Sequence, residues 1–114
     1  MVSAIYKILN KINNEPYVGK SKRVEKRWYQ HISALNNGDH YNYLLQKDWN
    51  DYGPEAFSFE IIKEAEPEYL NELEQFYIAF YDAMNNGYNL TGGGNGCVGC
   101  SRTKKSKKKK NNIQ

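Results

Sequence analysis

Cysteine is scarce in this sequence, and long apolar runs are absent from it. The two cysteines among the 114 residues are Cys97 and Cys100. Two are too few for a disulfide framework, and no second pair or nearby histidine completes the four ligands of structural zinc. No apolar run approaches the roughly 20 residues of a membrane helix, and no signal peptide opens the chain. We therefore expect a soluble intracellular protein, cytoplasmic or in the nucleoid or nucleus, with no membrane partner.

Charge is distributed unevenly along the chain. The formal net charge is +3. Residues 1–100 carry 9 lysines and arginines against 13 acids, whereas residues 101–114 carry seven basic residues and no acid. Residues 48–74 hold nine acids and one base. One face of the protein should therefore attract polyanions, and another should repel them.

The length predicts one domain with a modest core. We expect this domain to cover residues 1–91. Residues 92–114 are expected to form a glycine-rich linker and a basic, low-complexity tail that is disordered when alone. Such a tail is a generic polyanion binder, a localisation signal or only a solvated segment.

Apolar periodicity predicts three strands and three helices. The expected strands, rich in β-branched and aromatic residues, cover residues 3–9, 15–20 and 56–62. The expected helices, each with an apolar stripe at helical spacing, cover residues 22–36, 41–52 and 67–83. Ser21 can cap the first helix, and residues 88–90 should form a short extended return. This order indicates an α+β domain with a small antiparallel sheet.

Tyrosines and basic residues gather in the first two strands and the first helix. Tyr6 and Tyr17 lie in the strands, and Arg27 and His31 lie on the side of the helix that should face the sheet. Taken singly, each tyrosine more often packs in a core or at an edge. Arg27 and His31 more often form a surface pair with neighbouring acids. Together they suggest a site that cuts phosphodiesters.

Glu74 lies inside the apolar stripe of the third helix. An unpaired carboxylate in such a place is costly. Either a buried lysine or arginine pairs with it, or it binds a cation, and the pattern favours neither. One carboxylate can hold Mg²⁺ against a phosphate, because this cation prefers oxygen ligands and keeps several waters.

The expected chemistry needs cations beside the tyrosines. Arginine and lysine stabilise the charge that develops on phosphoryl oxygens. A tyrosine, with a pKa near 10, is a poor base until nearby cations lower its pKa. We expect Lys20, Arg27 and the metal to do so.

Several short motifs, in their order and spacing, resemble the GIY-YIG nuclease domain. They are Tyr6 in AIY, Tyr17 in YVG, Lys20, Arg27-Trp28-x-x-His31, Leu73-Glu74-x-x-Tyr77-Ile78 and Gly87-Tyr88-Asn89. The resemblance covers about residues 3–91 and implies a three-stranded antiparallel sheet flanked by helices. Members of this family cut DNA phosphodiesters with one Mg²⁺ or Mn²⁺.

The resemblance also implies a role for each of six residues. They are the paired tyrosines Tyr6 and Tyr17, the electrophilic arginine Arg27, the proton-transfer assistant His31, the metal ligand Glu74 and the supporting residue Asn89. Tyr6 is our first choice as the base, and Tyr17 is the second. Without the resemblance, Asn89 would be read as a turn residue.

Two positions set this chain apart from a simple match. Ala4 stands where the family name has its first glycine. Alanine keeps close packing possible but not a backbone angle that requires glycine. The resemblance also places Lys20 near Tyr17, whereas strict alternation along a strand puts them on opposite faces. We therefore expect the second strand to end, and the chain to turn, at Gly19.

We predict a DNA endonuclease of the homing-endonuclease type, from a phage or mobile element, with a single metal and a tyrosine base. The acids for a two-metal cage are not gathered around Glu74. The expected DNA-binding residues belong to the first helix with its preceding residues and to the tail: Lys20, Lys22, Arg23, Lys26, Lys104, Lys105, Lys107, Lys108, Lys109 and Lys110.

Two alternatives stay open. One is a basic nucleic-acid-binding module without catalysis, although a decayed site should have lost one of the six residues and none is missing. The other is a nuclease that cuts branched or damaged DNA in repair. The sequence indicates neither the oligomeric state nor the DNA specificity.

Overall fold

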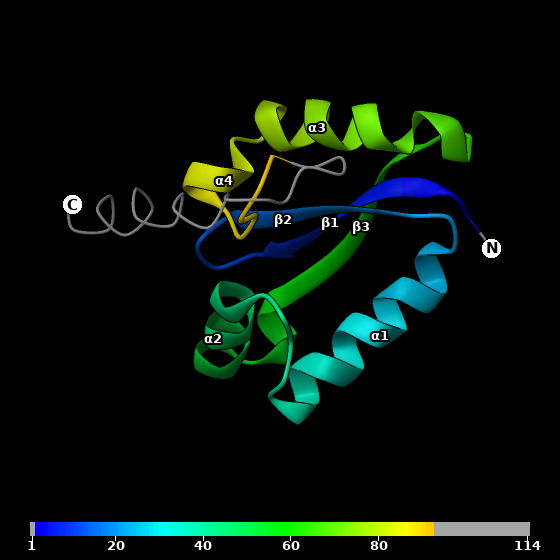
Figure 1. Cartoon of the computed structure of the whole chain (residues 1–114). Coiled ribbons are helices and arrows are strands. Elements are labelled where there is room, and N and C mark those ends of the chain that lie inside the picture. Colours follow the sequence, from blue (N-terminus) through cyan, green and yellow to red (C-terminus); the bar gives the residue numbers. More distant parts are fainter. Residues whose placement is uncertain (1, 93–114) are drawn as a thin grey trace.

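A three-stranded antiparallel sheet lies at the centre of the fold, with helices on both of its faces (Figure 1). The computed structural model describes residues 2–92. The expectations for the basic tail and for Cys97 and Cys100 lie outside the described residues. The predicted α+β class with a three-stranded antiparallel sheet is confirmed.

The sheet has the strand order β2-β1-β3. β1 (Ala4–Asn10) is central, and β2 (Glu15–Ser21) and β3 (Phe57–Glu64) both pair with it antiparallel. β3 extends two residues past its predicted end, because it pairs along the whole of β1, with an irregularity between Ile5 and Tyr6. Because β1 is central, β2 is an edge strand and has no neighbouring strand along its outer side.

Alternation along β1 divides the core into two parts, one on each face of the sheet. Ala4, Tyr6 and Ile8, which alternate along the strand, belong to one buried cluster, and Ile5 belongs to the other. Ala4 is fully buried and does not have a positive φ, so its backbone needs no glycine. The departure from the family pattern at this position is accommodated by ordinary strand geometry.

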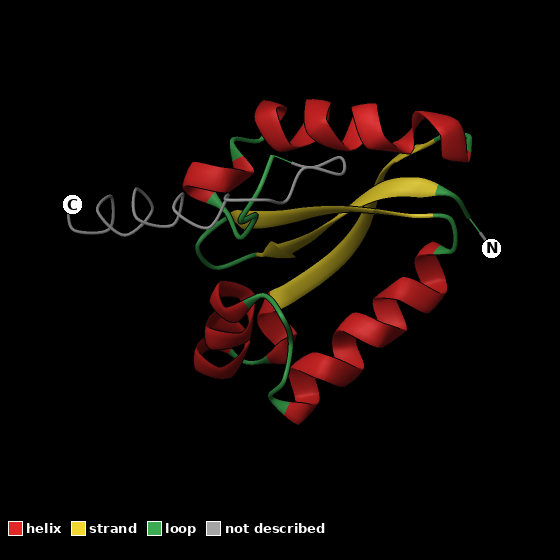
Figure 2. Ribbon diagram, in the orientation of Figure 1, coloured by secondary structure: helices red, strands yellow, loops and turns green. Residues whose placement is uncertain are grey.

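Two helices cover each face of the sheet (Figures 1 and 2). α1 (Val24–Asn37) and α2 (Tyr43–Tyr52) lie on one side. α3 (Leu70–Phe80) and the short α4 (Ala83–Asn86) lie on the other. Two 3₁₀ turns, η1 (Pro54–Ala56) and η2 (Pro67–Tyr69), precede β3 and α3.

α1 presents its predicted apolar stripe to the sheet. Val24 and Leu35 are buried, and Trp28 and Ile32 pack against the same cluster. The predicted cap at Ser21 is wrong, because β2 extends through Ser21, and this hydroxyl accepts from the backbone N–H of Arg23 at 2.9 Å. The helix ends at Gly38 in a left-handed conformation, as expected.

The third predicted helix, residues 67–83, is interrupted. Asp82 adopts a left-handed conformation with φ 54°, which ends α3 and starts α4. Its carboxylate accepts from the side-chain amides of Asn85 at 3.0 Å and Asn86 at 2.6 Å. These local bonds stabilise a turn that the helical periodicity did not reveal.

The predicted extended return at residues 88–90 is not a strand. Instead, the Asn89 side chain accepts from the Val18 N–H at 2.8 Å and donates to the Val18 carbonyl at 2.9 Å. The Asn89 side chain thus satisfies both backbone groups of Val18 at the outer edge of β2, as the backbone of a fourth strand would. A Cβ on Gly87 would lie 2.2 Å from the Pro16 carbonyl oxygen, so this close approach requires glycine.

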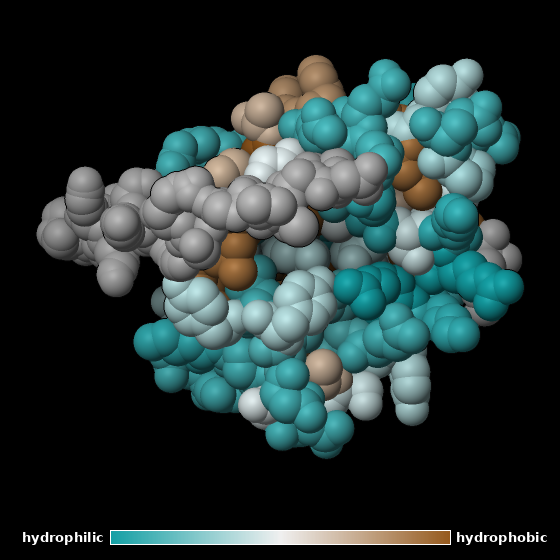
Figure 3. Space-filling model, viewed as in Figure 1, coloured by the Kyte–Doolittle hydropathy of each residue, from teal (hydrophilic) through white to brown (hydrophobic). Residues whose placement is uncertain are grey.

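The outer face of α3 is apolar near its C-terminal end. Figure 3 shows a hydrophobic patch over this helix, where Phe76 and Phe80 are 57% and 66% exposed. The inner stripe behaves as predicted, since Leu70 is buried and Leu73 and Tyr77 pack against it. No helix within residues 2–92 is long and apolar enough to cross a membrane.

Candidate active site

The hydroxyl of Tyr6 reaches from the central strand over the open edge of the sheet. Gly19 pairs with Tyr6 across β1 and β2, and a Cβ on Gly19 would lie 2.6 Å from the Tyr6 hydroxyl oxygen. Glycine is therefore needed here for space. The predicted end and turn at Gly19 are wrong, because β2 continues to Ser21.

A buried series of hydrogen bonds begins at Tyr6. Its hydroxyl lies 2.7 Å from His31 Nε2, and His31 Nδ1 lies 2.7 Å from His40 Nε2. The backbone N–H of Asn42 donates to His40 Nδ1 at 3.0 Å. Tyr6, His31 and His40 are 1%, 2% and 7% exposed, so the series is closed to bulk water.

The Asn42 N–H sets the direction of the whole series. Because it can only donate, His40 Nδ1 must accept, and neutral His40 carries its proton on Nε2. His40 then donates to His31 Nδ1, which leaves the His31 proton on Nε2. His31 Nε2 therefore donates to the Tyr6 oxygen, which is the acceptor at the end of the series.

Both histidines are held neutral. Burial, with the nearby charge of Arg27, lowers the pKa of His31 to about 3. The same two causes lower the pKa of His40 to about 4. At neutral pH the series therefore contains no imidazolium, and His31 acts as a neutral donor.

The pKa values of Tyr6 and Tyr17 are raised in the structure, whereas the sequence suggested that they would be lowered. Burial raises the pKa of Tyr6 above its usual value, and the charge of Arg27 only partly opposes this. Burial likewise raises the pKa of Tyr17, and the hydroxyl of Tyr41 beside it adds to the rise. Arg27 does lower the pKa of both tyrosines, as expected, but desolvation outweighs it, so the net shift in the protein alone is upward.

Arg27 lies at the rim of the same cluster. Its Nη1 donates to Gln30 Oε1 at 3.3 Å, and its Nη2 donates to the hydroxyl of Tyr41 at 3.0 Å. A hollow of about 320 Å³ opens beside it on the α1 side. The lining residues are mostly basic or polar: Ser21, Lys22, Arg23, Lys26, Arg27 and Gln30. Of the basic residues predicted to bind DNA in this region, Lys22, Arg23 and Lys26 share this surface, which is suited to a phosphate backbone, whereas Lys20 lies at Glu74 instead.

Glu74 stands on the other face of the sheet, beside the edge strand. Its Oε1 lies 3.1 Å from Lys20 Nζ, and the two side chains are 12% and 30% exposed. Tyr17, in contrast, packs against the α1 cluster, so strand alternation does separate it from Lys20. The charge of Glu74 still reaches Tyr6, where it slightly raises the tyrosine pKa.

The donor set around Glu74 fits one hard cation rather than a cage. Within residues 2–92 no group of three or more histidine, cysteine or acidic side chains is positioned to hold a metal. Mg²⁺ commonly takes one or two carboxylates and completes its shell with water and substrate phosphates. A single, mostly buried carboxylate at an open strand edge is compatible with that mode.

The structure thus brings Tyr6, Tyr17, Arg27 and His31 into one cluster. The Tyr17 and His31 rings lie 5.6 Å apart between centroids. Glu74 approaches from the opposite face, and Asn89 contacts the backbone of β2 instead of the cluster. The contacts of Asn89 therefore support an indirect role, in which it fixes the backbone of β2 at Val18.

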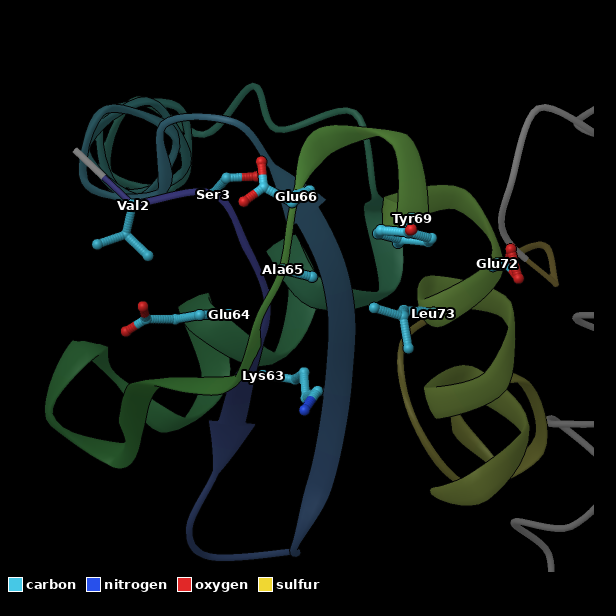
Figure 4. Close-up of a pocket in the computed structure, with 9 residues that line it drawn as sticks. All are labelled: Val2, Ser3, Lys63, Glu64, Ala65, Glu66, Tyr69, Glu72 and Leu73. Atoms are coloured by element: carbon cyan, nitrogen blue, oxygen red, sulfur yellow. The ribbon is translucent and has the colours of Figure 1, made fainter.

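A larger hollow of about 760 Å³ lies away from these residues (Figure 4). The N-terminal segment, the end of β3 and the start of α3 line it, with side chains that include Glu64, Glu66 and Glu72. Its acidic lining would repel a phosphate backbone. The hollow therefore has the wrong charge for the phosphodiester site.

Two residues with contacts to the predicted site were missed from the sequence. His40 and Tyr41 lie in the connection between α1 and α2, because α2 begins at Tyr43 and not at residue 41 as predicted, so helical spacing did not apply to either residue. The sequence did contain one signal: Asn42, two residues after His40, is of a type that commonly caps a helix, and it caps α2. Asn42 accepts from the N–H groups of Leu44 and Leu45 and so fixes the orientation of this connection.

Comparison with known proteins identifies the family. A family model described as the GIY-YIG catalytic domain matches residues 2–89. Intron-associated endonuclease 1 of Enterobacteria phage T4 is 39% identical over 92 residues, which cover 79% of this chain and 37% of that protein. The chain thus matches little more than a third of the length of this relative.

Two solved structures have the same fold. A Glu-to-Ala mutant of the catalytic domain of intron endonuclease I-TevI superimposes with a TM-score of 0.77 at 37% identity, covering 84% of this chain and 100% of that one. The catalytic domain of homing endonuclease I-TevI gives 0.74 at 37% identity, with coverages of 78% and 98%. Together with the match over residues 2–89, these similarities show that the chain belongs to the GIY-YIG catalytic domain family.

Proposed function

We propose that this protein is a DNA endonuclease that hydrolyses phosphodiester bonds with one divalent cation. The observation that carries the proposal is the Tyr6 hydroxyl, which lies 2.7 Å from His31 over Gly19 of the edge strand and is bonded to Arg27, a residue that lines the basic hollow. The matched relatives are endonucleases by name, which supports the same reading.

Tyr6 is the proposed general base. A water molecule attacks phosphorus, its proton passes to the ionised Tyr6 oxygen, and the bond from phosphorus to the leaving oxygen breaks. The donor at His31 Nε2 stabilises the phenolate in this role, because a hydrogen bond to the charged form favours ionisation. Burial raises the pKa of Tyr6 in the free protein, so ionisation is expected only when DNA and the cation occupy the site.

Arg27 is the proposed electrophile. Its N–H groups already contact three partners, Gln30, Tyr41 and the Tyr6 hydroxyl. A guanidinium has five N–H donors in a planar fork, so donors remain for phosphoryl oxygens. Holding such donors in place before the reaction stabilises charge that develops in the transition state.

Glu74 is the proposed cation ligand. When bound there, Mg²⁺ or Mn²⁺ would stabilise the negative charge on the leaving oxygen. Lys20 lies at hydrogen-bond distance from the same carboxylate and is well placed to move to a phosphate when the cation binds. The lysines and arginines of residues 20–26, and those of residues 104–110, are proposed to bind the DNA backbone.

The test is incubation of purified protein with supercoiled plasmid, with Mg²⁺ and with EDTA. We expect nicked or linear product only with the cation, and none from the Arg27→Ala variant. A control variant, Lys47→Ala, removes a basic residue from the exposed side of α2 and should cleave normally. Tight DNA binding without cleavage by the unmodified protein would instead indicate the non-catalytic binding module.

The preferred DNA structure needs a separate measurement. A panel of linear duplex, nicked, branched and damaged DNA separates a duplex endonuclease from a repair nuclease. We expect cleavage of ordinary duplex, in agreement with the homing-endonuclease name of a matched structure. Cleavage restricted to branched or damaged DNA would support the repair alternative.

A further inference from the structure

The hydroxyl of Tyr41 bridges two residues of the proposed site. It accepts from Arg27 Nη2 at 3.0 Å and lies 2.9 Å from the hydroxyl of Tyr17. The guanidinium carbon of Arg27 lies 5.8 Å from the centroid of the Tyr41 ring. Tyr41 is therefore the residue through which Arg27, on α1, and Tyr17, on β2, are joined.

The segment that carries Tyr41 is fixed from both sides. Its ring stacks on His40, with centroids 4.5 Å apart and planes at 26°. The His40 backbone N–H donates to Gln46 Oε1 at 3.0 Å. On the other side, the Asn42 side chain donates to the Tyr88 carbonyl at 2.6 Å. Tyr41 can thus present its hydroxyl in one place although 61% of the residue is exposed.

We propose that Tyr41 is a positioning residue that holds the Arg27 guanidinium and the Tyr17 hydroxyl in their working orientations. The inference rests on the proposed function and adds to it a residue outside the six predicted from the sequence. An arginine side chain on a helix surface has many rotamers. Its bonds to Gln30, Tyr41 and Tyr6 select one of them, so that the remaining donors stay aimed in one direction.

The hydroxyl bridge from Tyr41 to Arg27 and Tyr17 can be tested separately from the stability of the fold. The Tyr41→Phe variant removes the hydroxyl and keeps the ring that stacks on His40. Because Tyr41 is 61% exposed, its hydroxyl lies outside the buried core, and the one partner hydroxyl that loses a hydrogen bond is that of Tyr17. A positioning role predicts lower activity at unchanged stability, whereas a structural role predicts that both fall together.

Single-turnover cleavage at saturating protein is the first test. Tyr41→Phe should reduce this rate about tenfold, a typical minimum for a misplaced catalytic group, with DNA affinity and melting temperature unchanged. Tyr52→Phe, another partly exposed tyrosine at the end of α2, is the matched control and should cleave normally. An unchanged rate in Tyr41→Phe overturns the proposal, and so does a loss that tracks the melting temperature.

A double-mutant comparison tests the route through Arg27. In an Arg27→Lys background the planar fork is already lost, so Tyr41→Phe should cause less than a twofold further loss. Two losses that multiply in full would show that Tyr41 acts independently of Arg27, and would overturn its proposed role in positioning Arg27.

The orientation of Arg27 can be measured without any cleavage. In ¹⁵N-labelled free protein, the Arg27 Nη signals should be distinct in the unmodified chain and averaged by rotation in Tyr41→Phe. Averaged signals in both proteins would overturn the bridge itself. If the signals differ as expected while the unmodified protein fails to cut DNA, the proposed function is wrong and the bridge stands.

Discussion

The ammonium nitrogen of Lys20 lies 3.1 Å from Glu74 Oε1, joining the edge strand β2 to α3. The two residues are 54 positions apart in the sequence, and Lys20 follows Gly19, the residue against which the Tyr6 hydroxyl lies. A cation proposed to bind Glu74 must therefore displace Lys20 or share the carboxylate with it.

Lys20→Met should strengthen cation binding to the free protein. Removing the ammonium group takes away a competitor and a repelling charge. A partly exposed ion pair contributes up to about 1 kcal/mol, which corresponds to an affinity about fivefold higher. Titration of Mn²⁺ by calorimetry measures the effect. Lys47→Met, which breaks the exposed pair with Asp51, is the control for loss of one charge and should leave Mn²⁺ affinity unchanged.

Glu74→Ala should abolish cleavage while preserving DNA binding. Binding should even strengthen slightly, because a negative charge near the phosphates is removed. The measurements are the cleavage rate at saturating protein and the DNA affinity. Glu72→Ala, on the exposed side of the same helix, should cleave at the unmodified rate. An active Glu74→Ala protein would disprove the assignment of the cation ligand.

Tyr6→Phe should reduce cleavage by about 10²–10⁴, the usual contribution of a general base. It also leaves the His31 Nε2–H without its acceptor in a buried place, so the free energy of unfolding should fall by about 1–3 kcal/mol. Urea unfolding confirms that the variant is folded before its rate is compared. Cleavage at the normal rate would exclude Tyr6 as the base and make Tyr17→Phe the next variant to test.

Stability should decrease as the pH falls below 6.5. The pKa values of His31 and His40 fall from 6.5 in the unfolded chain to about 3 and about 4 in the folded one. Between these limits the unfolded state binds more protons, so each histidine reduces stability by up to about 1.4 kcal/mol per pH unit. Above pH 6.5 their contribution is fully present.

Urea unfolding at pH 7.5, 6.0 and 5.0 measures this loss. His40→Gln removes one of the two groups and should reduce the slope between pH 6.5 and 5.0 by about half. Equal slopes in both proteins would show that His40 is not buried in its neutral form.

The basic residues after Cys100 should govern the salt dependence of DNA binding. Each phosphate contact contributes roughly −0.9 to the slope of log affinity against log salt. Ending the chain at Cys100 removes seven basic residues, so the slope should flatten by several units. Cleavage at saturating protein should remain close to normal, because the proposed site lies before residue 91. An unchanged slope would mean that these residues do not contact DNA.

Local patterns in the sequence predicted the main helices and strands and the face of each that packs inward. Alternation in β1 placed Tyr6 on the same side as Ala4 and Ile8, and helical spacing in α1 turned His31 toward that side. Both residues therefore meet as expected. The physical reason is that the burial of apolar side chains, which a repeat of 2.0 or 3.6 residues records, decides which face of an element packs inward.

Contacts between distant segments were decided only by the tertiary structure. The sequence left Glu74 between an ion pair and a cation site, and packing of α3 against β2 brought Lys20 to it. Likewise, His40 and Tyr41 reach the site from a connection without periodicity. The break at Asp82 depends on side-chain bonds that helical spacing does not record. A repeat determines which face of an element is buried, but which partner a polar side chain meets depends on how the elements pack in space.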